Sequence, residues 1–329
     1  MVLRIGVIGA GVVGLSSALA VQKRLAHAQV DIMADRFTTY TTSNGAGGLF
    51  MPRLQDPDVL DMAKDSADFF YSLARSADSG PSGVSFINGF YLYNGDDEQF
   101  PVWTKLMISV RELPEEFRTM YEKHYKHGCM MTTAIIEGSK YLPWLTDRFI
   151  ANGGRITEKT VESFDELAGD YDLVLNCAGL GAGKLANDPT VHPVRGQVMH
   201  VSAPWLTYFV NSDDTHYFFP HSEDAVIGGV RQPGSYDLAP DPQESRRMLR
   251  EMEERLPPLK GAKILSDWVG LRPSRDRVRV EAETVNCRGK QLKVVHNYGH
   301  GAFGISLSWG TAVRTANLVH QALTARSKL

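Results

Sequence analysis

The chain has 329 residues, of which 43% are hydrophobic and 22% are charged, which is ordinary for a globular protein. This length favours two domains. A net charge of −3 leaves no basic footprint for nucleic acid, and no apolar run approaches the ~18 residues that cross a membrane. Three widely separated cysteines, Cys129, Cys177 and Cys287, argue against a disulfide framework or a metal site, and favour a reducing compartment.

The first twenty residues predict a strand, a glycine turn and a helix. The run from 3 to 8 is apolar and β-branched, as in a parallel strand that is covered on both faces. Gly9, Gly11 and Gly14 follow in the spacing G-x-G-x-x-G. The first glycine allows the tight turn, the second lets a diphosphate approach the backbone, and the third lets helix and strand pack closely. The diphosphate is expected at the N–H groups and the positive dipole end of the helix.

A second strand-like run, 29–34, ends at Asp35. An acidic residue there is suited to accept hydrogen bonds from ribose hydroxyls. The loop that follows, 36–52, is rich in hydroxyl groups and glycine, with Thr41, Thr42 and Ser43 followed by a glycine-rich stretch. Hydroxyls and bare N–H groups hold phosphate oxygens without a bulky side chain in the way. These features together predict a dinucleotide site.

The next segment mixes helix and strand signals. Residues 57–77 have the apolar spacing of an amphipathic helix, and 83–93 are strand-like. The polar stretch 94–140 predicts one helix, near 114–126. His124 and His127 lie about one turn apart there, but without further ligands in the sequence they are not expected to bind metal.

A second strand–glycine unit follows. A helix is expected over 141–152, where Gly153 and Gly154 end it, and 155–164 alternates like a strand. Residues 172–176 predict a buried strand that runs straight into a glycine turn at 179–183. Because ligands collect at the carboxyl ends of such strands, this turn should face the same cofactor. Cys177 has no paired base in view and is interpreted as a packed residue.

The last part is mainly β. Short strands are expected over 191–240, a helix over 241–255 and a strand over 263–269. A strand near 294–298, a glycine-rich turn and a helix over 308–323 then repeat the opening design. The sequence therefore predicts a second helix N-terminus directed at the same ligand.

Taken in order, these motifs are similar to those of the D-amino-acid oxidase family, over nearly the whole chain. They are GAGVVG at 9–14, ADRFTTYTTSNGAGGL at 34–49, NCAG at 176–179, GGVRQPGSY at 228–236, GLRPSRDRVRVE at 270–281 and NYGHGAFG at 297–304. The resemblance implies an α/β fold, in which a Rossmann-like FAD-binding domain is interleaved with a mixed α+β substrate domain. The expected FAD-binding domain is 1–50, 141–190 and 280–329, and the substrate domain is 51–140 and 191–279.

The resemblance also implies site residues. Expected FAD contacts, with two loop residues included, are Gly9, Gly11, Gly14, Asp35, Arg36, Thr41, Thr42, Ser43, Gly47, Gly48, Leu49, Val161, Arg279, Gly301, Gly304, Ile305 and Ser306. Expected substrate contacts are Tyr217, Arg231, Arg272 and the backbone at Ala302. Tyr217 and Arg272 are the residues expected to take part in catalysis, by orienting the substrate.

The two arginines suggest the substrate class. An α-carboxylate needs a cation, and the planar guanidinium of Arg272 can bind it in a bidentate manner, with a phenolic hydrogen bond from Tyr217. Family members that act on neutral D-amino acids usually carry an apolar residue at the position of Arg231. An arginine there suits a side-chain carboxylate and favours D-aspartate, with D-glutamate close behind. Residues 211–215 lack the tyrosines that some relatives carry, so the shape of the pocket lid stays open.

The implied reaction transfers hydride from Cα to flavin N5. The imino acid becomes a 2-oxo acid with release of ammonia, and O2 is reduced to H2O2. The mechanism assigns no general base, and His300, between two glycines, is interpreted as structural. Three alternatives stay open: an oxidase of neutral D-amino acids, an NAD-dependent dehydrogenase and a non-catalytic flavoprotein.

The last three residues predict a location. Ser327, Lys328 and Leu329 form the tripeptide that the peroxisomal import receptor binds. Peroxisomal residence is also what the family resemblance implies. We therefore expect a peroxisomal enzyme whose partners are a D-amino acid, O2 and that receptor, with no nucleic acid or membrane partner.

Overall fold

The computed structural model describes residues 2–54, 56–94, 100–120, 125–212 and 215–324. Within these ranges the strands join one sheet of 14 strands, whose main path runs β4-β5-β3-β9-β10-β11-β8-β13-β14-β7-β1-β2-β6. One end of this path is parallel and the other is mostly antiparallel. The predicted combination of a Rossmann-like part and a mixed α+β part is confirmed.

The parallel part has the strand order β14-β7-β1-β2-β6. Its strands are β1 (Arg4–Ile8), β2 (Gln29–Ala34), β6 (Arg155–Glu158), β7 (Leu173–Asn176) and β14 (Lys290–His300). β1, β2 and β7 are almost wholly buried, as their continuous apolar runs predict for strands that are covered on both faces.

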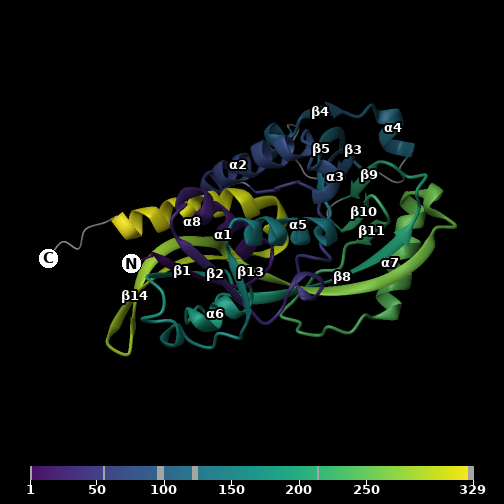
Figure 1. Cartoon of the computed structure of the whole chain (residues 1–329). Coiled ribbons are helices and arrows are strands. Elements are labelled where there is room, and N and C mark those ends of the chain that lie inside the picture. Colours follow the sequence, from purple (N-terminus) through teal and green to yellow (C-terminus); the bar gives the residue numbers. More distant parts are fainter. Residues whose placement is uncertain (1, 55, 95–99, 121–124, 213–214, 325–329) are drawn as a thin grey trace.

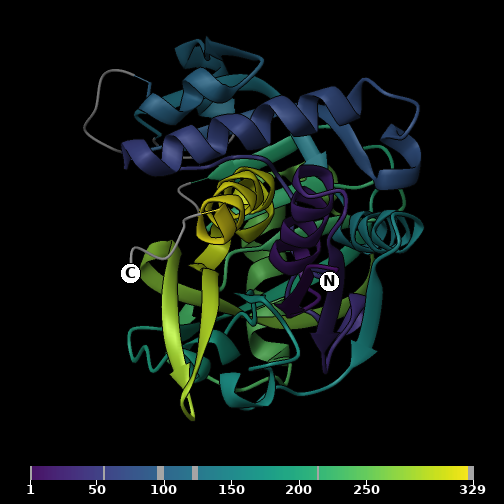
Figure 2. The same cartoon turned by 60° about the vertical axis from the view of Figure 1, so that its left-hand side comes forward.

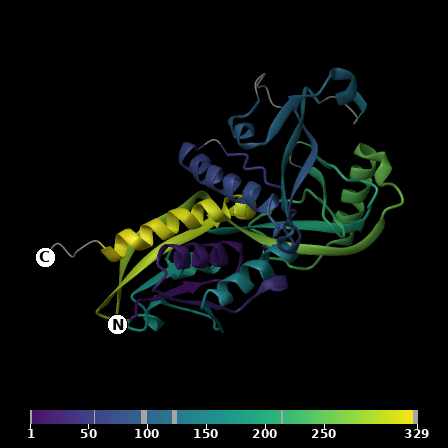
Figure 3. The same cartoon turned by 45° about the horizontal axis from the view of Figure 1, so that its top comes forward.

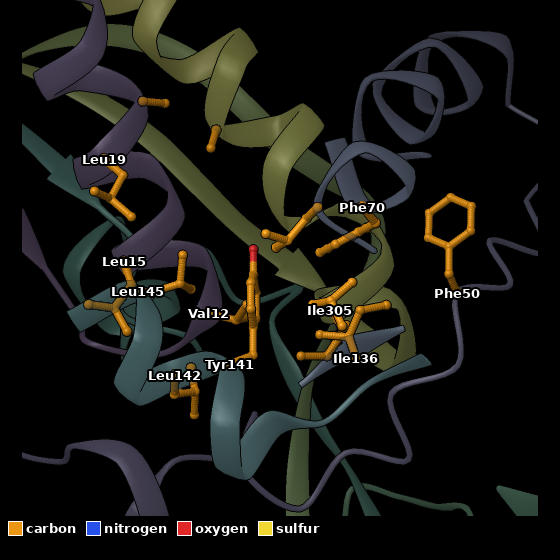
Figure 4. Close-up of a cluster of buried hydrophobic side chains, with 14 of the residues drawn as sticks. Val12, Leu15, Leu19, Phe50, Phe70, Ile136, Tyr141, Leu142, Leu145 and Ile305 are labelled. Carbon is orange, nitrogen blue, oxygen red and sulfur yellow. The ribbon is translucent and has the colours of Figure 1, made fainter. Parts of the chain in front are cut away.

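Three long helices pack together over one face of the parallel part. They are α1 (Val12–Arg24), α5 (Gly138–Ala151) and α8 (Gly304–Thr324). Figure 4 shows how Tyr141 of α5 lies among side chains of α1 and α8, close to Ile136 and Phe70. A second apolar cluster on β1, β7 and β14 packs against 3-10 helix η3 (Phe164–Glu166) and the segment near α6 (Gly181–Leu185).

The antiparallel part contains short strands in sequence order. They are β3 (Val84–Tyr93), β4 (Ser109–Glu112), β5 (His127–Ile136), β8 (His192–Ser202), β9 (Phe209–Ser212), β10 (His216–Pro220), β11 (Ala225–Gly228) and β12 (Gln232–Pro233). Amphipathic α7 (Pro242–Arg255) buries Met248 and Met252 against β8, β10 and β11, in a core of its own. Its N-cap Asp241 accepts a hydrogen bond from the amide of Gln243, and proline occupies the first helical position.

α2 (Pro57–Ala74) connects the two parts. It lies across α8 in Figure 2, with Phe69 stacked on Trp309 at a ring distance of 3.8 Å. The amide of Gly310 donates to the hydroxyl of Ser66, and a Cβ atom at Gly310 would lie 1.7 Å from a backbone oxygen of α2. Glycine is therefore required for this close helix packing. The short helices α3 (Ser79–Ser82) and α4 (Glu115–Met120) complete this side of the molecule.

The strand β13 (Lys263–Cys287) runs through both parts. Its first half pairs with β8 and its second half with β14, and the register shifts between Ser274 and Arg279. In Figures 1 and 3 it forms a long band beneath the helices. The sequence predicted only its first seven residues, because the arginine-rich stretch that follows lacks an apolar pattern.

The predicted helix near 114–126 is largely wrong. α4 ends at Met120, and β5 begins at His127, whose ring stacks on Tyr93 across the strand pair. His127 therefore faces a strand neighbour instead of lying one helical turn from His124, which is outside the described residues. Pairing with β3 and β4 stabilises β5 although its flanks are polar. Helix α8 begins at Gly304, four residues earlier than predicted.

None of the helices in the described ranges combines the length and apolar character needed to cross a membrane. The interleaved domain boundaries stay a prediction.

Candidate functional site

A cavity of about 1250 Å³ lies between the ends of the parallel strands and the face of the antiparallel part. All four predicted substrate residues line it. So do these predicted FAD residues: Gly9, Gly11, Asp35, Arg36, Thr41, Thr42, Ser43, Gly47, Gly48, Leu49, Val161, Gly301, Gly304, Ile305 and Ser306. Gly14 and Arg279 are not among the lining residues. Segments far apart in sequence therefore meet at one cavity.

The turn from β1 to α1 has the geometry that a diphosphate needs. Gly9 has φ +108°, and a Cβ atom there would lie 2.4 Å from the carbonyl oxygen of Cys177. At Gly11 the nearest atom to a Cβ would be the hydroxyl of Ser43, at 3.4 Å, so the backbone stays open toward the cavity. That hydroxyl accepts a hydrogen bond of 3.1 Å from the amide of Val12. α1 has no acidic residue in its first turn, which suits an anionic ligand.

The glycine-rich loop is fixed from several sides. The hydroxyl of Thr42 donates to the carbonyl of Leu271 at 3.1 Å. Gly48 has φ +74°, and a Cβ atom there would overlap the carbonyl of Ile136. The ring of His221 bonds the carbonyl of Gly47 at 3.1 Å. This loop is therefore ordered by its own contacts with three different segments.

The imidazole of His221 belongs to a small ionic cluster. Its other nitrogen lies 3.3 Å from Asp224, which also bonds His200 at 2.6 Å. Burial alone would lower the pKa of His221, but the hydrogen bonds to Asp224 and to the Gly47 carbonyl raise it. Burial would raise the pKa of Asp224, yet its bonds to the two histidines hold that pKa well below its usual range. The protonated His221 thus favours the observed loop position.

The last helix brings its N-terminus to the cavity, as predicted. Residues 301–306 all line it, and the hydroxyl of Ser306 reaches the carbonyl of Leu49 at 3.5 Å. His300 is buried, its Nε2 lies 3.2 Å from the hydroxyl of Thr311, and burial lowers its pKa to about 4. A neutral, internally bonded ring fits the structural role expected for His300. Burial likewise raises the pKa of the Cys177 thiol to about 12, as suits a packed cysteine.

At the other end of the cavity, Tyr217 and Arg272 lie together. The ring of Tyr217 stacks on Phe219 at 4.4 Å, and the guanidinium of Arg272 donates to the carbonyl of Val230 at 3.2 Å. Burial raises the pKa of Tyr217, while its hydrogen bond with Arg272 opposes the rise. A Cβ atom at Gly196 would lie 2.3 Å from the guanidinium, so this glycine makes room for it. The positive group is thereby fixed beside a phenol.

Tyr217 belongs to a row of residues in register across the sheet. Successive strand partners are Tyr91, Asn211, Tyr217, Gly228, Val198 and Trp268, on β3, β9, β10, β11, β8 and β13. Residues paired in this way point to the same face of a sheet. Four of them, Asn211, Tyr217, Val198 and Trp268, line the cavity.

Two lining residues escaped the sequence analysis. Asn211 is only 2% exposed, and its Oδ1 has no hydrogen-bond partner among the described residues. Arg53 is half-buried, and its pKa is lowered to about 10 by burial and by the charge of Arg231, against the influence of Tyr91 and Tyr217. The available signal for Arg53 was a single cation within the apolar stretch that follows the glycine-rich loop.

Arg279 contacts a different set of residues. It donates to the hydroxyl of Tyr298 at 2.7 Å and pairs with Glu281 at 2.5 Å and Glu283 at 3.3 Å. Tyr298 in turn donates to Asp188 at 2.9 Å. Whether Arg279 contacts FAD stays a prediction.

The chain matches a family model described as FAD dependent oxidoreductase over residues 4–318. It is 37% identical to D-aspartate oxidase of Homo sapiens, over 98% of this chain and 96% of the relative. It is also 34% identical to D-aspartate oxidase 1 of Caenorhabditis elegans, over 99% of both chains. The structure of glycine oxidase from Geobacillus kaustophilus superimposes with a TM-score of 0.80 at 19% identity, covering 97% of this chain and 95% of that one, which shows a shared fold.

The cofactor is thus FAD, and an NAD-dependent dehydrogenase is not supported. The open backbone at Gly11, the acid-free first turn of α1 and the second helix N-terminus at Gly304 fit that cofactor. By its motifs, fold and relatives, the chain belongs to the D-amino-acid oxidase family of FAD-dependent oxidoreductases.

Proposed function

We propose that the protein oxidises acidic D-amino acids, D-aspartate first and D-glutamate second, to 2-oxo acids with release of ammonia and H2O2. The observation that carries this proposal is the presence of Arg231 and Arg272 along one cavity, with Tyr217 beside Arg272. A substrate with two carboxylates matches two separate guanidinium groups. The relatives named D-aspartate oxidase support the same substrate class.

The protein's part in the reaction is mainly orientation. Arg272, held by the carbonyl of Val230, binds the α-carboxylate, and the hydroxyl of Tyr217 adds a hydrogen bond to it. Arg231 binds the side-chain carboxylate, and two fixed points together decide which face of Cα is presented. When bound, FAD accepts the hydride from Cα at N5 and passes the electrons to O2. No side chain is required as a general base.

The FAD residues of this proposal are those that line the cavity. The glycine turn and the N-terminus of α1 hold the diphosphate, and Asp35 accepts from the ribose. Backbone N–H groups over 301–306 and the dipole of α8 stabilise negative charge on the flavin ring. Gly14 serves by close packing instead of contact.

Peroxide release tests the reaction and Arg231→Ala tests the substrate. The wild type should release H2O2 with D-aspartate and not with L-aspartate. The variant should lose D-aspartate activity by a few kcal/mol of transition-state binding, about 30-fold or more, and change little with D-alanine. Arg246→Ala, an exposed arginine on α7, is the matched control. Equal losses with both substrates would favour an oxidase of neutral D-amino acids.

We further propose peroxisomal residence through Ser327, Lys328 and Leu329, which lie outside the described residues. A fluorescent protein fused ahead of the chain should collect in peroxisomes. Deleting the tripeptide should leave the fusion in the cytosol, and unchanged peroxisomal signal would refute its role.

A further inference from the structure

We propose that Arg53 is a specificity-determining residue that binds the side-chain carboxylate of the substrate together with Arg231. The acidic substrate would then contact three arginines, with Arg272 at the α-carboxylate and the other two at the distal carboxylate. This assignment rests on the proposed function. It adds a residue from the segment that follows the glycine-rich loop, far from the other two arginines in sequence.

The backbone around Arg53 is well fixed. The amide of Phe50 donates to the carbonyl of Ala134 at 2.9 Å, and Phe50, Met51 and Pro52 are buried. The amide of Arg53 itself donates to the carbonyl of Met51 at 3.0 Å. A long side chain that starts from a fixed backbone loses less freedom when it binds a ligand. Arg53 is therefore preorganised at the wall of the cavity.

Its surroundings place Arg53 at the substrate end. The groups whose charges act on it are Tyr91, Arg231 and Tyr217, and Tyr217 is itself hydrogen-bonded to Arg272. The four residues Arg231, Arg53, Tyr217 and Arg272 thus form a connected electrostatic group that lines one cavity.

Two of these cations repel one another. The charge of Arg231 lowers the pKa of Arg53, which means that the two guanidinium groups are close enough to interact unfavourably. An anion that contacts both relieves this repulsion and gains two charge-assisted pairs. A monocarboxylate already bound at Arg272 has no second anionic group to offer, whereas D-aspartate has one.

The lining carboxylates lie elsewhere. Among the described residues that line the cavity, the acidic ones are Asp35, which follows β2, and Glu162, which pairs with Lys184. β2 and β6 form the far edge of the parallel part, whereas Tyr217 lies on β10 of the antiparallel part. The cavity therefore separates charge, and its positive end suits a dianion.

Ligand binding to the FAD-loaded protein tests the assignment without turnover. Succinate is D-aspartate without its amino group, and butyrate is the monocarboxylate of the same length. Binding of each is followed by the change in flavin absorbance and by the shift in melting temperature. For Arg53→Met we expect about a 30-fold or greater loss of succinate affinity, and less than about a threefold change for butyrate.

Two further variants keep the test decisive. Arg53→Lys retains the charge without the planar fork, so it should recover part of the succinate affinity even if Arg53→Met binds FAD poorly. Arg246→Ala should bind both ligands as the wild type does. The steady-state counterpart is a raised KM for D-aspartate in Arg53→Met with an unchanged KM for D-alanine.

The outcomes separate the two proposals. If the wild type binds succinate no better than butyrate, the acidic substrate of the proposed function is wrong. If the wild type prefers succinate and Arg53→Met keeps that preference, the proposed function stands and the assignment of Arg53 is overturned. A loss that is equal for the two ligands also overturns it, because a merely structural role would affect both.

Discussion

Gly14, in the first turn of α1, packs directly against the carbonyl oxygen of Gly9, and a Cβ atom at position 14 would lie 2.0 Å from that oxygen. Both atoms belong to fixed backbone, so neither can move aside cheaply. At Gly11, by contrast, a Cβ would meet only the hydroxyl of Ser43, at 3.4 Å. The two glycines of the motif therefore serve different purposes, and substitutions should separate them.

Gly14→Ala should destabilise the protein even without FAD, by about 1–3 kcal/mol, because it overpacks the helix–strand contact. Gly11→Ala should leave the stability of the FAD-free protein nearly unchanged and weaken FAD binding, because its methyl group enters the cavity. Urea unfolding of the FAD-free proteins and titration with FAD measure the two effects. Equal loss of stability in both variants would contradict this division.

Arg272→Met should lower kcat/KM about 100-fold or more for both D-aspartate and D-alanine. The α-carboxylate is common to the two substrates, and a substrate that is misplaced by 1 Å reacts far more slowly. Arg272→Lys should recover little, since an ammonium group lacks the bidentate geometry. Steady-state peroxide release across both substrates provides the measurement, and a loss confined to D-aspartate would assign Arg272 to the side chain instead.

FAD binding should weaken as pH rises, through His221. The folded-state pKa of this residue is raised above its ordinary value near 6.5, so its stabilising bond to the Gly47 carbonyl is fully present below that value and is lost as pH rises through the folded pKa. In His221→Gln, whose amide can donate at every pH, the FAD dissociation constant should vary less between pH 6 and pH 8.5. Exposed His192→Gln is the control, and parallel pH profiles in all three proteins would exclude this role.

Asn211→Leu should raise stability by about 1 kcal/mol and lower activity toward D-aspartate. The amide is buried with its Oδ1 unpaired among the described residues, so an apolar side chain of similar size removes a desolvation cost. The same substitution removes a polar group beside Tyr217 in the cavity. Asn88→Leu, where the oxygen accepts from Thr132 at 2.6 Å, should not be stabilising. Urea unfolding and peroxide release measure the two effects, and a variant that is less stable than the wild type would refute the argument.

Much of the fold follows from local patterns in the sequence. The glycine turns, the strand at 29–34 and the helix near 242–255 were predictable because each has an apolar period and a defined start or end. β5 and the second half of β13 were not, because their stability comes from pairing with strands on both sides. Such pairing overrides the weak local preference of a polar segment.

The site shows the same contrast. Residues within motifs, such as Gly9 and Arg272, were identified because the motif gives their position. Arg53 and Asn211 belong to no motif, and only the folding of the chain brings them near Tyr217. Arg279 lies within a motif, yet it pairs with Tyr298 and Glu281 and does not line the cavity.

The construction of the cavity has a consequence for the order of events during synthesis. β1 and α1 are made first, but β7 pairs with β1 only after residue 173, and β14 pairs with β7 only after residue 293. The helix N-terminus at Gly304 is made later still. On a ribosome the nascent chain therefore has no complete FAD site until nearly its last residues have emerged, so cofactor loading must follow release.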